Sequence, residues 1–220
     1  TGLGNHGWHN MVITSDETSF DGNFLLLGNA KLDADASWSD GAFSFEYWPG
    51  DYQNPETYAN PAGIPLSFLV DFSDFENMSL KFEMYVPSSN PWMAGALQII
   101  PAPVTMVSYG DAGAVDKFGN VLGGSNNKYI SGEGAAPARR ALYRPWETTG
   151  SFDTGDKWIT VTIPMNSATF AYDLNGKAND GEYNAASWDS LVLFVVSGGK
   201  SGTECTPIIK IDNIRAVPNK

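Results

Sequence analysis

The chain is poor in cysteine and histidine, and this scarcity excludes several kinds of chemistry. Cys205 is the only cysteine, so no internal disulfide can form, and a small buried side chain is its expected role. The two histidines, His6 and His9, lie close together near the start of the sequence. A Ser-His-Asp triad would have to use them, and no Gly-x-Ser-x-Gly turn accompanies them. Terminal fraying or local packing is favoured over a metal pair.

Basic residues are also scarce. The chain has 13 Lys and Arg against 25 Asp and Glu, which gives a formal net charge of −12 and a pI of about 4.4. Binding to phosphate groups relies on clustered Lys and Arg, so nucleic acid is an unfavourable partner. The same repulsion disfavours anionic polysaccharides such as pectins or sulfated galactans. A neutral polysaccharide meets no such objection.

Long apolar runs are absent as well. No run approaches the ~20 residues that a membrane helix needs, so we expect no membrane contact by this domain itself. The sequence starts at Thr1 without a methionine or a signal-peptide pattern. We therefore expect a fragment of a longer protein whose export signal or lipid anchor lies outside this sequence.

What the sequence does contain is a repeated alternation of apolar and polar residues, which is typical of β-strands. The run 191–196 is instead apolar throughout, as in a central strand. The pattern predicts an all-β fold, a β-sandwich or jelly roll, as a single domain over residues 1–220. The predicted strands are 11–14, 23–27, 42–48, 79–86, 96–100, 140–143, 158–163, 191–196 and 208–215.

Carboxylates do not form an obvious catalytic pair. Most glycoside hydrolases need two of them flanking the scissile bond, and here Glu46 and Glu83 are isolated within their predicted strands. Asp71 and Asp74 lie in a loop-like segment. Acids from different strands could still converge, so a sandwich-fold hydrolase or lyase stays open as the alternative to a binding protein. A structural or adhesive surface domain is the other alternative.

No cofactor is predicted, and structural calcium is only a weaker alternative. Residues 173–182 are rich in oxygen ligands, but their spacing departs from a calcium loop, and a polar hairpin is favoured. Asp212 lies within an apolar strand, where a carboxylate needs hydrogen bonds, a cation or a metal. A backbone contact is the favoured partner there.

Seven tryptophans are the most informative feature that is present. An indole offers a large apolar face to a sugar ring, while its N–H still needs a polar partner. Trp158 and Trp188 adjoin regular strands and are expected to cap the core, and Trp8 is undecided. The candidates for sugar stacking adjoin the long stretches 49–65 and 101–138 or predicted strand ends, and packing under a loop competes for each. These candidates are Trp38, Trp48, Trp92 and Trp146, accompanied by Tyr52, Tyr143 and Arg144, whose guanidinium offers a fork of donors to hydroxyl groups.

Several short segments resemble the C-terminal glycan-binding domain of Bacteroidetes surface glycan-binding proteins, of the xyloglucan-binding type found in polysaccharide utilisation loci. The similarity extends over residues 11–217. The segments are Asp21-Gly22-Asn23-Phe24-Leu25, Leu80-Lys81-Phe82-Glu83, Tyr143-Arg144-Pro145-Trp146, the run Trp158–Pro164 and Ile211-Asp212-Asn213-Ile214-Arg215.

The resemblance implies a β-sandwich like that of carbohydrate-binding modules, without catalytic activity. It implies a protein held outside the outer membrane by a lipidated N-terminus and upstream Ig-like domains. Such a protein captures polysaccharide for neighbouring glycanases and a SusCD-type importer. Stacking aromatics of the family would correspond to Trp38 or Trp48, and further ones to Trp92 and Trp146. The ligand class is then a neutral glycan such as xyloglucan, another β-glucan or a mannan.

Overall fold

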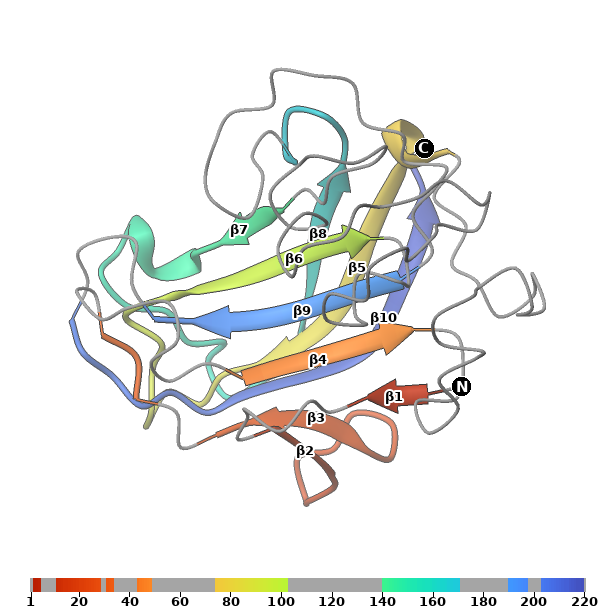
Figure 1. Cartoon of the computed structure of the whole chain (residues 1–220). Coiled ribbons are helices and arrows are strands. Elements are labelled where there is room, and N and C mark those ends of the chain that lie inside the picture. The colour runs from red at the N-terminus through yellow and green to blue at the C-terminus, as the bar shows by residue number, and fades with distance from the viewer. Residues whose placement is uncertain are drawn as a thin grey trace, which may run out of the picture.

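The structure is a computed structural model in which two antiparallel β-sheets face one another (Figure 1). Short 3-10 helices lie at Phe75–Asn77 and Pro145–Glu147. In the described part of the chain, no helix is long and apolar enough to cross a membrane. The residues that the structure describes are 2–4, 11–28, 31–33, 43–48, 74–102, 140–170, 190–197 and 203–219.

The first sheet contains five strands, and β9 lies at its centre. Each strand is antiparallel to its neighbours. In their order across the sheet the strands are β1 (Gly2–Gly4), β4 (Phe43–Trp48), β9 (Ser190–Val196), β6 (Ala96–Ala102) and β7 (Ala141–Tyr143).

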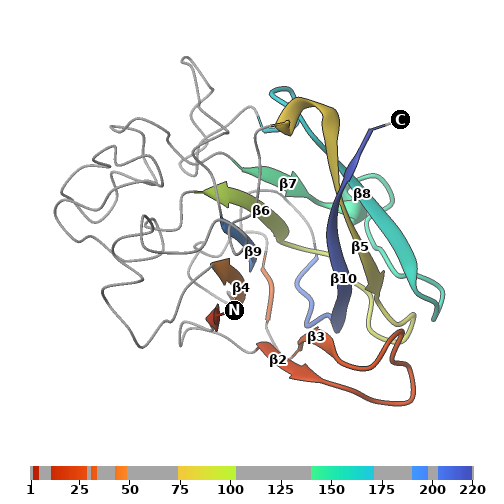
Figure 2. The same ribbon diagram turned by 90° about the vertical axis from the view of Figure 1, so that its right-hand side faces the viewer.

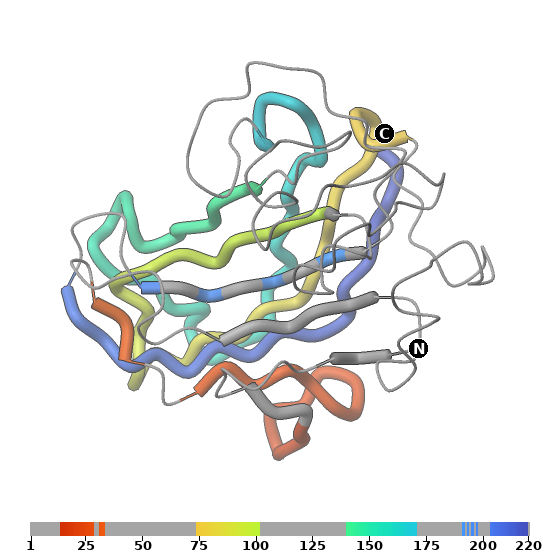
Figure 3. Tube along the Cα trace, in the orientation of Figure 1, coloured from red at the N-terminus to blue at the C-terminus, as the bar shows by residue number. Residues whose placement is uncertain are grey.

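The second sheet also contains five antiparallel strands. The last strand of the chain, β10, lies between the early strand β3 and the middle strand β5, as the trace in Figure 3 shows. Across this sheet the strands are β2 (Met11–Thr14), β3 (Phe24–Leu27), β10 (Ile209–Pro218), β5 (Met78–Tyr85) and β8 (Ile159–Met165).

The two sheets form separate layers when the molecule is viewed from the side (Figure 2). From β8 onward, each strand lies in the opposite sheet from the strand before it. This alternation between layers is typical of jelly-roll sandwiches. The prediction of an all-β sandwich is therefore confirmed.

The core lies between the layers and is built by the predicted alternation. In β8, Val161, Ile163 and Met165 are buried, whereas Thr160 and Thr162 are exposed. Successive side chains of a strand point to opposite faces of its sheet, so each strand contributes one face to the core and presents the other outward. The outer faces are the surfaces on which a ligand could bind.

Candidate functional site

The outer face of the first sheet carries polar and apolar side chains next to β7. Gln98 of β6 is paired with Leu142 of β7, while the neighbouring Leu97 and Ile99 belong to the core. Only 8% of Gln98 is exposed, whereas 38% of Leu142 is exposed. A nearly buried amide beside an exposed leucine makes this face a candidate ligand surface, because the amide both donates and accepts hydrogen bonds.

Two of the predicted binding residues, Tyr143 and Arg144, lie at the end of β7. The Tyr143 ring packs edge-on against Trp92 and Phe152, with centroids 6.2 and 6.5 Å apart, and burial raises the pKa of its phenol. Arg144 is half-buried, and its buried Nε has no hydrogen-bond partner among the described residues. The described residues leave part of the hydrogen-bonding capacity of the Arg144 guanidinium unfilled, whereas Tyr143 packs against the core, so Arg144 is the stronger candidate of the two.

The structure corrects the prediction for Trp92 and Trp146, which are 0% and 3% exposed and belong to the core. The backbone of Trp92 forms a β-bridge with Phe152, and the Trp92 Nε1 donates to the Ala94 carbonyl at 2.6 Å. The Nε1 of Trp146 donates to the Gly95 carbonyl at 2.9 Å. Both indoles thus have their polar partner inside the protein and offer no face to a sugar ring.

Trp48 is the last residue of β4, where it is paired with Gly2, and its side chain is not described. The register places Tyr143 in line with Phe43, across β6 and β9. Trp48 is therefore about 17 Å further along the strands and about 14 Å across them from Tyr143. The two positions lie at opposite corners of the first sheet, so one sugar ring cannot contact both. Trp38 and Tyr52 lie outside the described residues.

The outer face of the second sheet carries an aromatic cluster, formed by Phe20, Phe24, Tyr85 and Trp158. The Trp158 ring lies 6.0 Å from Phe20, 6.0 Å from Phe24 and 5.7 Å from Tyr85, measured between centroids. Trp158 and Tyr85 are half-buried, and Phe20 is exposed. Trp158 thus packs on the outer face of the second sheet with these three rings, where the sequence predicted a cap on the core.

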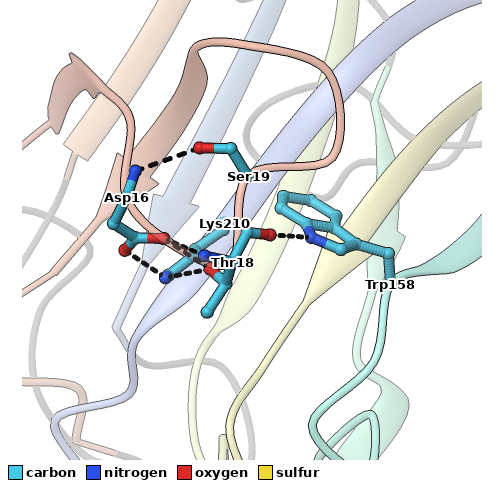
Figure 4. A network of polar contacts seen from close by, with 5 residues as sticks. All are labelled: Asp16, Thr18, Ser19, Trp158 and Lys210. Atoms are coloured by element: carbon cyan, nitrogen blue, oxygen red, sulfur yellow. Dashed lines mark hydrogen bonds and ion pairs between the residues drawn. The ribbon is translucent and has the colours of Figure 1, made fainter.

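Lys210 of β10 is bonded to the β2–β3 loop, to which Trp158 of the aromatic cluster is bonded as well (Figure 4). Its Nζ donates to Asp16 Oδ2 at 2.6 Å and to Thr18 Oγ1 at 2.7 Å, and it lies 4.8 Å from the centroid of the Phe24 ring. The hydrogen bond from Lys210, followed by that from Thr18, lowers the pKa of Asp16 to about 2. Trp158 Nε1 donates to the Thr18 carbonyl, which ties the indole to the same loop.

Carboxylates in the second sheet are engaged in structural contacts. Glu83 accepts hydrogen bonds from Arg215 Nη2 and the Thr160 hydroxyl, each at 2.8 Å. Asp212 lies at a bulge in β10, where its Oδ1 accepts the N–H of Asn213, a residue with φ of 51°. A backbone contact is therefore present at Asp212, as favoured above.

The described residues contain no group of three or more His, Cys, Asp or Glu side chains that could hold a metal ion. The Oδ2 of Asp212 is buried without a hydrogen-bond partner among the described residues, and structural calcium there stays a prediction. Residues 173–182, the other candidate calcium loop, lie outside the described residues. That the chain needs no cofactor stays a prediction.

The geometry can be compared with known proteins. A family model described as the surface glycan-binding protein B xyloglucan binding domain matches residues 2–218. The chain belongs to this family. The surface glycan-binding protein PbSGBP-B from Prevotella bryantii has a similar crystal structure, with 42% sequence identity and a TM-score of 0.74. The match covers 99% of this chain and 52% of that one, so the chain spans about half of that relative.

More distant structures share less with the chain. SGBP-B from a complex xyloglucan utilization locus in Bacteroides uniformis is 17% identical, with a TM-score of 0.45 over 96% of this chain and 45% of that one. A family 11 carbohydrate-binding module from Clostridium thermocellum is 15% identical, with a TM-score of 0.44 over 99% of this chain and 89% of that one. No curated protein gave a match.

Membership of this family makes the chain a non-catalytic glycan-binding domain with a role at the cell surface. The predictions of family, sandwich fold, glycan binding and lack of catalysis are confirmed. The alternatives of a hydrolase, a lyase and a purely structural domain are set aside. Two of the tryptophans chosen as candidates for sugar stacking, Trp92 and Trp146, lie in the core.

Proposed function

We propose that this domain binds xyloglucan or a closely related neutral β-glucan on the outer face of the first sheet, next to β7. The family match over residues 2–218 carries the ligand class. The half-buried Arg144, with its unpartnered Nε, supports the location, together with the Gln98 amide and the exposed Leu142. The guanidinium and amide would bind sugar hydroxyls, and Leu142 would contact the apolar face of a sugar ring.

The net charge of −12 supports a neutral ligand. A polyanion would be repelled by the surface as a whole, whereas a neutral glucan forms hydrogen bonds that do not depend on net charge. Trp48, Trp38 and Tyr52 remain candidates for stacking. Trp48 lies at the far corner of the same sheet, so an extended chain that contacts Arg144 would have to cross the sheet diagonally to reach it.

The site is tested by substituting Arg144 and Gln98 with methionine, which keeps similar bulk and removes the polar groups. We expect Arg144→Met to weaken retention by xyloglucan in affinity electrophoresis about tenfold, because a hydrogen bond to a charged group is lost. Arg144→Lys keeps the charge without the planar fork and should be intermediate. Gln98→Met should weaken binding less, because its amide is neutral.

An unrelated exposed position, Asp153→Asn, serves as the control and should leave retention unchanged. If both methionine variants are retained as strongly as the wild type, the binding surface lies elsewhere. If the wild-type domain is not retained by any neutral polysaccharide, the proposed ligand class is wrong.

We further propose that the whole protein is anchored at the outer membrane and passes its glycan to surface glycanases and a SusCD-like importer. The family's cell-surface role supports this place in glycan uptake. Loss of surface labelling after deletion of an N-terminal lipidation signal from the full-length gene would test the anchoring.

A further inference from the structure

The aromatic cluster on the second sheet presents rings to solvent on the face of the sandwich opposite Arg144. Phe20 is 51% exposed, and among the described residues Leu142 is the other exposed large hydrophobic side chain. A single exposed hydrophobic residue is ordinary. Phe20 differs because its ring continues into the half-buried rings of Trp158 and Tyr85, which together make one aromatic surface.

This surface is held rigidly from two sides. On one side, the Trp158 indole is bonded to the Thr18 carbonyl, and the loop that carries Thr18 is tied to Lys210. On the other side, the turn before Trp158 is fixed by Asp156, whose carboxylate accepts hydrogen bonds from the N–H and the hydroxyl of Ser88 at 3.0 and 2.7 Å. Preorganised rings lose little entropy when a ligand stacks on them.

The polar groups around the rings fit a neutral ligand rich in hydroxyl groups. Burial raises the pKa of the Tyr85 phenol, and the negative charges of Asp156, Asp16 and Glu17 raise it further. Lys210 is already paired with Asp16. Carboxylates accept hydrogen bonds from sugar hydroxyls, the phenol can donate or accept, and an anionic ligand would be repelled.

We propose that Phe20, Trp158 and Tyr85 form a second saccharide-binding platform, which stacks a neutral sugar ring and accepts a hydrogen bond from one of its hydroxyls at Asp156, two residues before Trp158. The proposal rests on the proposed function for the class of ligand, a neutral glycan. Two platforms on opposite faces raise the retention of a polymer network through multivalency. They add much less to the affinity for a short oligosaccharide bound at the first sheet.

The test combines one substitution with one spectroscopic signal. We expect Phe20→Ala to weaken retention in a xyloglucan gel about fivefold or more, by analogy with the loss of one stacked ring. Calorimetric affinity of the first-sheet site for a short xylogluco-oligosaccharide should be unchanged. Phe20→Tyr keeps a ring and should be retained like the wild type. Because Phe20 is exposed, neither substitution should prevent folding.

The signal is the indole N–H resonance of Trp158, assigned by comparison with Trp158→Phe. In the Arg144→Met protein, where the first-sheet site is weakened, this resonance should still shift on addition of the oligosaccharide. If it does not move at saturating sugar and Phe20→Ala has no effect on retention, the second platform is overturned while the proposed function stands. A shift caused only by a lysine-rich peptide overturns it too, and identifies a protein-docking surface.

Discussion

Trp92 and Trp146 are buried although each directly follows a proline in a stretch without regular alternation. If the strand continued past Tyr143, alternation would place Trp146 on the face of Leu142, but the strand ends at Tyr143 and the chain turns into a 3-10 helix. That turn directs the indole into the core, where the Gly95 carbonyl accepts its N–H. The prediction failed because alternation has no meaning beyond the last residue of a strand.

The burial of Trp146 can be tested by its effect on stability. We expect Trp146→Ala to lower the free energy of unfolding by about 3–5 kcal/mol, because a large core side chain is replaced by a cavity and the Gly95 carbonyl loses its donor. Urea unfolding followed by circular dichroism measures this loss. A variant that keeps its stability but no longer binds xyloglucan would show instead that Trp146 contacts the ligand.

The alternation of the strands does contain information about the face of the sheet on which Trp158 lies. Trp158 has the opposite parity to Ile159, Val161 and Ile163, and Tyr85 has the opposite parity to the buried apolar residues of β5. Alternation alone thus places both rings on an outer face, although Trp158 was expected to cap the core. The contact between the two rings could not be predicted, because it depends on the pairing of β5 with β8. This pairing brings together residues that are far apart in the sequence, such as Glu83 and Thr160, which are separated by 77 positions.

At the scale of elements, the β2–β3 loop is fixed to the last strand by the ion pair between Asp16 and Lys210. The loop has an internal turn in which the Thr18 N–H and hydroxyl both donate to Asp16 Oδ1. These contacts make the loop, and with it Phe20, a defined part of the second sheet's outer face. Their strength depends on the charge of Asp16.

This dependence predicts how stability changes with pH. The folded-state pKa of Asp16, about 2, is below its ordinary value of 3.8, so the charged carboxylate stabilises the fold above pH 3.8. The stabilisation is lost as pH falls through about 2. We expect Asp16→Asn to be less stable than the wild type at neutral pH, and the difference to shrink below pH 3.8.

Urea unfolding at a series of pH values measures this difference. The matched control is Asp21→Asn, which removes the same charge from an exposed position in the same loop. It should change stability little at any pH. A constant difference between Asp16→Asn and the wild type down to pH 3 would mean that the ion pair does not depend on the charge of Asp16.

Most strands were predictable from the sequence. Their first and last residues differ from the expected ones by no more than three positions. The run 191–196 was identified as a central strand, and β9 is the middle strand of the first sheet. β1, at Gly2–Gly4, was missed because two glycines and a leucine carry no alternation. It becomes a strand only by pairing with the end of β4.

At the scale of the whole molecule, the sandwich offers two outer faces with different chemistry. The first sheet presents an arginine, an amide and a leucine beside β7, and the second presents an aromatic cluster with carboxylates around it. The fold and the class of ligand followed from the sequence, because alternation, net charge and family resemblance can be determined without knowing which strands pair with one another. The proposed binding surfaces followed only in part, through Arg144, because they are assembled from strands that are far apart in sequence.

The most direct test of the account is a calorimetric titration of the wild-type domain with xyloglucan, with the release of reducing ends followed in the same samples. We expect saturable binding in the micromolar range, roughly −8 kcal/mol, that is insensitive to salt and releases no reducing ends. Absence of binding to xyloglucan and other neutral β-glucans, or release of new reducing ends, would contradict the claim that this is a non-catalytic domain for neutral glycans.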